Sequence, residues 1–127
     1  MKLCTALTYT GNIAETAAYA RALEAAGIDM IAVPELYSVD AVSILGYVAA
    51  HTERVELFAG ILPIYSRTPA LIAMTAAGLD AVSGGRFVLG LGTSGPQVIE
   101  GWHGVPFDKP LRRTREVIDI CRLVWRR

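Results

Sequence analysis

A glycine-rich segment is the first place in this 127-residue sequence where backbone could approach a ligand closely. Gly90, Gly92 and Gly95 satisfy the GxGxxG pattern directly after an apolar run, so a nicotinamide-binding Rossmann domain has to be considered. That domain needs a long helix after the glycines and an acidic residue at a strand end about 20 positions further on. Here residues 96–102 allow only a short helix, and residues 113–116 lie within the final predicted helix. The pattern therefore disfavours dinucleotide binding.

Glu35 follows Pro34 at the end of the second apolar run. In a parallel βα array, the carboxyl ends of the strands form the face where active sites lie. A carboxylate there could hold a substrate or accept a proton, which makes Glu35 the candidate catalytic residue. A solvated or helix-capping glutamate is the alternative interpretation. The sequence assigns no other catalytic acid or base.

The histidines and cysteines form no metal-binding motif. His51 ends a predicted helix on the face opposite Glu35 and is expected to be structural, while His103 is expected in a surface loop without a neighbouring ligand. Cys4 and Cys121 lie far apart and form no CxxC pair. They are predicted to be reduced, buried thiols, as suits a cytoplasmic protein.

The overall charge and hydropathy exclude several classes of partner. Twelve Lys and Arg balance twelve Asp and Glu, so no excess charge favours binding to nucleic acid. The longest apolar run, residues 70–79, is far shorter than the roughly 20 residues that a membrane helix needs. A soluble protein acting on a small-molecule substrate is expected, with no membrane or nucleic-acid partner.

The elements that would position these residues are four apolar runs separated by helical stretches. Strands connected in this way need crossover connections, which produce a parallel α/β sheet covered by helices. The runs are apolar on both faces, as burial in such a sheet requires. The predicted strands are Leu3–Tyr9, Met30–Pro34, Val55–Leu62 and Phe87–Leu91.

The helix boundaries support the same organisation. Asn12 with Glu15 resembles a capping box, and Gly27 stands where a left-handed residue would end the first helix. A second helix is predicted over about residues 40–51. Thr68 and Pro69 begin a third, which Gly84 and Gly85 end, and the last runs from about residue 110. The periodicity does not decide between four units of a (β/α)8 barrel and an open doubly wound sheet.

Two further features have more than one interpretation. Gly60, within the third predicted strand, could mark a bulge with unusual peptide geometry or a tight contact between helix and sheet. The third helix is apolar on nearly every side, so it needs a second partner besides its own sheet. That partner would be a second chain or sequence beyond these 127 residues.

Three segments together resemble the luciferase-like superfamily of oxidoreductases. They are residues 26–29, the run Gly60–Pro69 and the run Ser83–Gly92, and their order and spacing match over nearly the whole chain. Within the superfamily, residues 101–107 and 110–116 are similar to the branch that uses the deazaflavin coenzyme F-420, which includes reductases like methylenetetrahydromethanopterin reductase.

The resemblance implies a (β/α)8 TIM barrel that binds a flavin-type ring at its strand ends. Members often have a non-prolyl cis peptide in a strand-three bulge behind the ring, which falls at Gly60 and Ile61 in this chain. Gly92, Thr93 and Ser94 match the segment that approaches the ring edge. The implied cofactor is F-420 or FMN, without a metal, and the implied reaction is hydride transfer to or from a small organic substrate.

The match also has limits that shape the expectation. Glu35 matches an acidic position of the bacterial luciferase type, but Leu36 replaces the histidine that commonly follows, which favours a reductase or dehydrogenase over oxygen chemistry. Residues 1–127 are predicted to be the N-terminal half of the barrel, truncated before the phosphate-binding loops. Members often dimerise through the second and third helices, so a homo-oligomer is expected. A non-catalytic half-barrel scaffold is the alternative.

Overall fold

The structure is a computed structural model that describes residues 1–9 and 11–126. Short strands alternate with helices along the chain. The strands are β1 (Cys4–Ala6), β2 (Met30–Val33), β3 (Glu56–Ala59), β4 (Leu62–Pro63), β5 (Phe87–Val88) and β6 (Leu91–Gly92), and the helices are α1 (Ile13–Ala25), α2 (Ala41–Ala49), α3 (Pro69–Ser83), α4 (Pro96–Ile99) and α5 (Pro110–Trp125). All four predicted strand regions are confirmed, although the third and fourth are each divided in two.

The sheet is parallel and its strands follow one another in chain order, β1-β2-β3-β5, while β4 and β6 form a second parallel pair. A doubly wound sheet reverses its strand order at a switch point, where its ligand binds. No such reversal occurs among the described residues. This order decides the question that periodicity left open, in favour of four consecutive units of a βα barrel.

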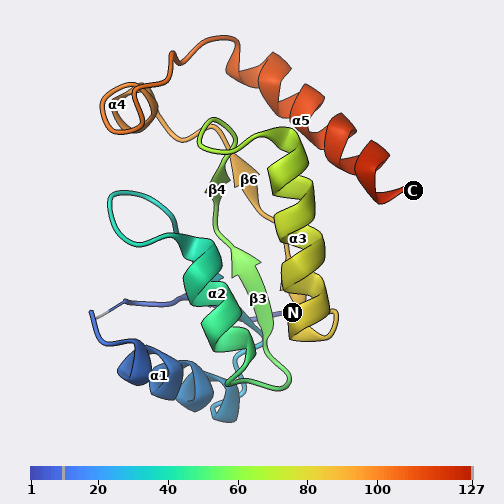
Figure 1. Cartoon of the computed structure of the whole chain (residues 1–127). Coiled ribbons are helices and arrows are strands. Elements are labelled where there is room, and N and C mark those ends of the chain that lie inside the picture. The colour runs from blue at the N-terminus through green and yellow to red at the C-terminus, as the bar shows by residue number, and fades with distance from the viewer. Residues whose placement is uncertain (10, 127) are drawn as a thin grey trace.

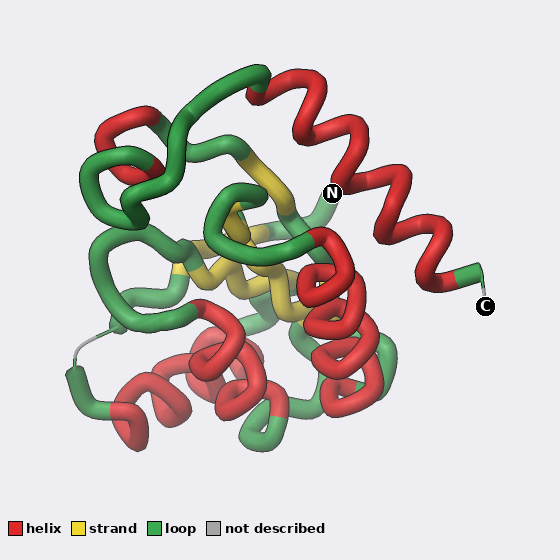
Figure 2. The backbone as a smooth tube through the Cα atoms, turned by 45° about the horizontal axis from the view of Figure 1, so that its top comes forward, coloured by secondary structure: helices red, strands yellow, loops and turns green. Residues whose placement is uncertain are grey.

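One face of the sheet is covered by helices and the other is open. Helices α1, α2 and α3 lie side by side on the covered face, and α5 leans against α3 (Figure 1). Ile31, Val33 and Leu57 point toward the helices and are buried, whereas Ala32 and Phe58 alternate with them and are partly exposed on the other face. In Figure 2 the strands lie near the centre of the view, framed by helices and loops.

The division of the third strand is a one-residue bulge. Leu57 pairs with Phe87 and Phe58 with Val88, but further along Leu62 pairs with Leu91. Three residues, 59–61, therefore oppose two residues, 89–90. This extra residue confirms the bulge interpretation of Gly60.

The predicted helix caps are present. The Asn12 side chain accepts hydrogen bonds from the backbone N–H groups of Ala14 and Glu15, and Thr68 accepts one from Leu71. Gly27 and Gly84 have φ of +86° and +67°, the left-handed conformation that glycine adopts most readily. Local side-chain chemistry therefore determines where these helices begin and end.

Helix α3 has neighbours on both flanks but an apolar outer face. It packs between α2 and α5 and buries Ile72, Ala73 and Leu79. Its outward side chains Leu71, Met74 and Val82 are 47%, 66% and 63% exposed. Helix α5 is thus part of the second packing partner that the sequence predicted for α3. Among the described residues, nothing covers the apolar stripe formed by these three side chains.

Arg86 joins four segments at the amino ends of the strands. All five N–H groups of its guanidinium donate hydrogen bonds: to the carbonyl oxygens of Ala49, Thr52, Val55 and Ser83 and to the Thr52 hydroxyl, at 2.7 to 3.0 Å. Ala49 and Ser83 end α2 and α3, and Val55 precedes β3. One side chain therefore satisfies carbonyl groups that these helix ends would otherwise leave unpaired.

Glu24 has a comparable role at the same end of the sheet. Its Oε1 accepts hydrogen bonds from the backbone N–H groups of Glu53, Arg54 and Val55 at 2.6 to 3.0 Å, which ties α1 to the loop before β3. Burial alone would raise the pKa of Glu24, but these N–H groups and the charge of Arg54 outweigh it, so the pKa lies below its usual value.

The two cysteines differ in their burial. Both cysteines are free, but the prediction that both are buried is wrong, because Cys4 is exposed on the open face of the sheet while Cys121 is buried between α5 and α3. Alternation along β1 places Cys4 on the side away from the helices. No helix within residues 1–9 and 11–126 is long and apolar enough to cross a bilayer.

Arg86→Met should lower the free energy of unfolding by roughly 2 to 4 kcal/mol, because four carbonyl groups and a hydroxyl lose a charged donor together. Arg86→Lys should fall between this variant and the unmodified chain, since an ammonium cannot reproduce the planar fork of donors. Urea denaturation would measure both. Arg21→Met, at an exposed arginine on α1, is the control and should change stability by less than about 0.5 kcal/mol. A similar small effect for Arg86→Met would contradict the assignment.

Candidate functional site

The predicted ring site lies at the bulge between β3 and β4. The Gly60–Ile61 peptide bond is cis, which confirms the expectation drawn from the family resemblance. The Gly60 N–H donates to the Val33 carbonyl oxygen at 3.0 Å, so the bulge stays attached to β2. Gly60 and Ile61 are each partly exposed, on the edge of the sheet where the strands end.

The fourth strand lies unusually close to this bulge because two of its residues are glycines. A Cβ atom on Gly90 would overlap the Ala59 carbonyl oxygen and the Phe58 ring. A Cβ atom on Gly92 would lie 3.0 Å from the Ile61 side chain. Gly90 thus permits a close approach of protein backbone to protein backbone, and not the approach to a ligand that the glycine pattern first suggested.

Thr93 and Ser94 follow β6 directly and form the predicted edge of the ring site. The Thr93 hydroxyl donates to the Ser94 carbonyl oxygen at 3.1 Å, and Ser94 has a φ of 55°, which few residues other than glycine adopt. Among the described residues, the Ser94 hydroxyl has no hydrogen-bond partner and is available to a ligand. The structure brings Ile61 against Gly92 and so places the five predicted ring residues in one region, but their role in binding stays a prediction.

Glu35 takes part in a buried ion pair that the sequence did not predict. Its two carboxylate oxygens accept from the two terminal nitrogens of Arg67, one at 2.8 Å, and Oε2 also accepts from the backbone N–H of Ala41 at 3.0 Å. The side chains of Glu35 and Arg67 are only 9% and 12% exposed. Glu35 therefore caps the start of α2, as its alternative interpretation proposed, and a proton-accepting role stays a prediction.

Asp40 extends the pair into a cluster of three charges. It is the N-cap of α2, accepts from the backbone N–H and hydroxyl of Ser43 at 2.8 Å, and also binds Arg67. Hydrogen bonds to Glu35, and then the charges of both carboxylates, raise the pKa of Arg67 against the effect of burial. Burial would raise the pKa of Asp40, but the Ser43 bonds and the Arg67 charge lower it overall.

Sequence reasoning missed Arg67, although a signal for it existed. Consecutive parallel strands are neighbours, so the loops after the second and third strands meet at the same edge of the sheet. Glu35 occupies the first of these loops and Arg67 the second. An acid and a base in adjacent carboxyl-end loops could therefore have been predicted to pair.

A cavity of about 410 Å³ lies beside the ion pair. Its walls include Leu36, Leu71, Trp102 and His103, and the rings of Tyr37 and Trp102 meet edge to face at 5.8 Å. The Nε2 atom of His103 is buried without a hydrogen-bond partner, so this residue is not the simple surface histidine that was expected. No group of three or more potential metal ligands occurs in the described part of the chain.

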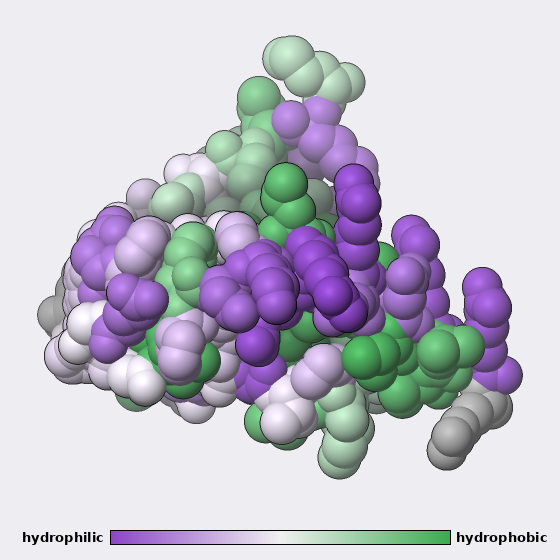
Figure 3. Space-filling model, turned by 90° about the horizontal axis from the view of Figure 1, so that it is seen from above, coloured by the Kyte–Doolittle hydropathy of each residue, from purple (hydrophilic) through white to green (hydrophobic). Residues whose placement is uncertain are grey.

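The face seen from above, where the carboxyl ends of the strands lie, carries hydrophilic and apolar side chains side by side (Figure 3).

His51 lies at the other end of α2, away from this face. Its Nδ1 donates to the Tyr47 carbonyl oxygen at 2.8 Å and its ring packs on the Tyr47 ring. This arrangement confirms the structural role expected for His51.

Comparison with known proteins gives a consistent result. The family model of luciferase-like monooxygenases matches residues 2–127. A putative coenzyme F-420-dependent oxidoreductase of Mycobacterium tuberculosis is 48% identical over all of this chain and 37% of its own length. A 5,10-methylenetetrahydromethanopterin reductase of Archaeoglobus fulgidus is 34% identical over 82% of this chain and 31% of its own length.

A solved structure shares the fold. The oxygenating constituent of 3,6-diketocamphane monooxygenase from Pseudomonas putida, in complex with FMN, superposes with a TM-score of 0.83 at 19% identity, covering 98% of this chain and 39% of that protein. The likeness confirms the predicted fold class, the first four βα units of a (β/α)8 barrel. The chain spans about a third of the length of the two curated relatives that it matches.

Removing either partner of the Arg67–Glu35 pair should destabilise the protein more than removing both. Arg67→Met leaves a nearly buried carboxylate without its cation and should cost roughly 2 to 4 kcal/mol. In a double-mutant cycle with Glu35→Gln, urea denaturation should give a coupling energy of about 1 to 3 kcal/mol.

The exposed pair Arg112–Glu116, one turn apart on α5, is the matched control. The cycle of Arg112→Met with Glu116→Gln should give a much smaller coupling energy, because solvent screens this exposed pair. Equal coupling in the two cycles would contradict the buried role of Arg67.

Proposed function

Because the chain belongs to the luciferase-like monooxygenase family, we propose that it contributes the ring-binding side of an oxidoreductase site. This site transfers hydride between a flavin-type ring, of F-420 or FMN, and a small organic substrate. Gly60 and Ile61 back the ring, and Gly92, Thr93 and Ser94 lie along its edge. The bulge at Gly60, packed against the glycines of the fourth strand, is the observation that carries the proposal.

The residues present fit a planar ring. A flat cofactor needs a surface from which few side chains project, and glycines occupy position 60 in the bulge and position 92 beside it. The residues of the bulge and rim are partly exposed, so a ring can reach them, and the Ser94 hydroxyl is available to donate to a polar ring atom. When bound, the ring supplies the centre that accepts or donates hydride.

The protein itself contributes orientation more than acid-base chemistry. Both carboxylate oxygens of Glu35 are occupied by Arg67 and the α2 backbone, so this carboxylate holds the loops around the ring site in place. Leu36 occupies the position after it. The proposal therefore leaves the catalytic acid or base unassigned and favours hydride transfer over oxygen chemistry.

F-420 is the preferred cofactor within the proposal. The relative with 48% identity is a putative F-420-dependent oxidoreductase, whereas the protein solved in complex with FMN is only 19% identical. The relatives are longer than this chain, which supports the proposal that residues 1–127 form part of a barrel; we propose that this part is its N-terminal half. A cytoplasmic location, expected from the free cysteines, belongs to the same proposal.

The purified chain should bind at least one of F-420 and FMN with micromolar affinity. Titrations that monitor the absorbance and fluorescence of each ring would measure this binding. Gly60→Val should abolish this binding. A Cβ atom added at position 60 would lie 3.0 Å from the Phe58 ring and 3.3 Å from the Ala32 methyl group, so a branched side chain must displace the bulge.

Gly78→Ala is the matched control for Gly60→Val. A Cβ atom on Gly78, within α3, meets nothing within 4 Å, so this variant should keep its ring affinity and gain stability. If the folded chain binds neither ring, a non-catalytic scaffold becomes the better account. Unchanged affinity in Gly60→Val would remove the bulge from the site.

The chain should also self-associate through α2 and α3. Leu71, Met74 and Val82 form an exposed apolar stripe on α3, and α2 carries no charged residue. Sedimentation velocity should show a dimer that the double variant Met74→Glu and Val82→Glu converts to monomer. Leu111→Glu, at an exposed leucine on α5, should leave the dimer intact. A monomer at all concentrations in the unmodified chain would refute the interface.

A further inference from the structure

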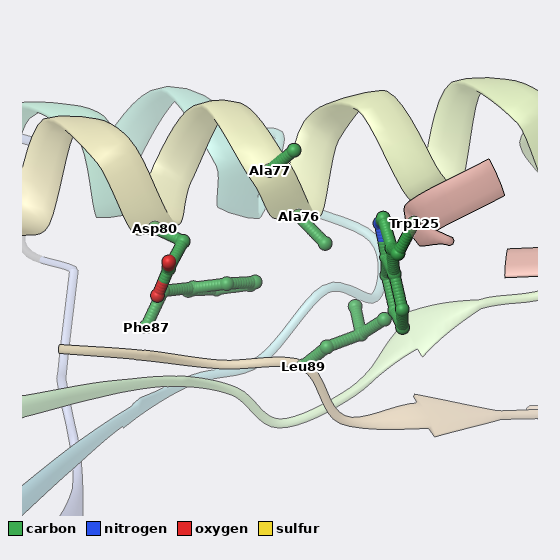
Figure 4. Close-up of a pocket in the computed structure, with 6 residues that line it drawn as sticks. All are labelled: Ala76, Ala77, Asp80, Phe87, Leu89 and Trp125. Carbon is green, nitrogen blue, oxygen red and sulfur yellow. The ribbon is translucent and has the colours of Figure 1, made fainter. Parts of the chain in front are cut away.

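A cavity of about 310 Å³ lies between α3, β5 and the end of α5, lined by none of the predicted ring residues. Six residues line it: Ala76, Ala77, Asp80, Phe87, Leu89 and Trp125. The Asp80 carboxylate lies at the Phe87 end and the Trp125 indole at the other, with the Ala76 methyl group pointing into the space between them (Figure 4).

The walls of this cavity are apolar and two of them are aromatic. The Trp125 indole N–H donates to the Ala73 carbonyl oxygen at 3.1 Å, which fixes the ring against α3. Phe87 and Leu89 come from the fourth strand region, and both pack against the main core. The small side chains of Ala76 and Ala77 leave the space open on the helix side.

Asp80 supplies the only charge in the lining. Its backbone carbonyl accepts from the Gly85 N–H at 2.8 Å and from the Ser83 hydroxyl at 3.2 Å, which holds the main chain of Asp80 at the end of α3. Its carboxylate, however, has no hydrogen bond or ion pair within the described residues. Asp80 is exposed, so a ligand can reach its carboxylate, and a carboxylate without a protein partner next to aromatic rings is complementary to a cation.

We propose that this cavity binds an organic cation that carries an apolar stem, such as an alkylammonium group. The ammonium group would pair with Asp80 and lie near the faces of the aromatic rings, whose quadrupoles attract positive charge. The stem would occupy the space beside Ala76 and Leu89. An anion would be repelled by Asp80, and a neutral apolar molecule would leave the carboxylate without a counter-charge.

This site goes beyond the proposed oxidoreductase function. The cavity lies between β5 and the helices α3 and α5, and none of the predicted ring residues lines it. Binding of the cation therefore does not require a bound ring, and each can be tested without the other.

The experiment uses Trp125 as its own reporter. The chain contains two tryptophans, and Trp102→Phe, at an exposed position, leaves Trp125 as the only one. n-Hexylammonium chloride should change the Trp125 fluorescence in a saturable way at millimolar concentration. n-Hexanol, the neutral molecule of the same length, should bind roughly three- to tenfold more weakly at matched ionic strength. Saturation-transfer NMR on the unmodified chain should give the same order of affinities.

In Asp80→Asn, n-hexylammonium and n-hexanol should bind with about equal affinity. Asp119→Asn, at an exposed aspartate of α5 outside the cavity, should leave the preference for the cation unchanged. Circular dichroism would establish that both variants are folded. Equal binding of the two probes to the unmodified chain would overturn the proposal. So would the absence of a saturable signal by both methods, or a cation preference that survives in Asp80→Asn.

Discussion

The geometry of the sheet depends on the fixed starting point that Arg86 provides. Its guanidinium holds the ends of α2 and α3 and the residue before β3, while its own carbonyl oxygen accepts from Leu57. The third and fourth strands therefore begin in a set register. Further along, β4 and β6 pair again with one residue more on the third strand, so the extra residue must be accommodated between them. The cis bulge at Gly60 and Ile61 lies where these two pairings require it.

The two ends of the sheet are held together by different kinds of interaction. At the amino end, Arg86 and Glu24 bind backbone groups. These backbone groups stay in place when neighbouring side chains are substituted. At the carboxyl end, Arg67 binds the side chains of Glu35 and Asp40, so the loops there depend on a small number of side-chain pairs. Loops held in this way can differ between relatives without disturbing the scaffold, as the active-site face of a βα barrel requires.

The sequence predicted the elements better than it predicted their contacts. Strand positions and helix caps follow from local patterns, so Asn12, Thr68 and Gly84 could be assigned correctly. The strand order could not, because barrels and doubly wound sheets use the same βα units, and the cis peptide came only from the resemblance to a family. The Arg67–Glu35 pair joins residues 32 positions apart and becomes visible only when adjacent loops are considered together. The burial of Cys4 was predicted wrongly because helices cover only one face of its strand.

Helix α3 connects the remaining features, because its side chains are arranged unlike those of an ordinary amphipathic helix. Small residues, Ala73 and Ala76, share the interior face with Ile72 and Leu79, while the large Leu71 and Met74 face outward. Small inward residues let the helix lie close to the sheet, and beside Ala76 they leave a cavity where a larger side chain would fill the space. Large outward residues expose apolar area that is stabilised only when another surface covers it. The same choice of residue sizes thus accounts for both the cavity beside Ala76 and the exposed apolar stripe, on which the proposed cation site and the proposed dimer interface rest.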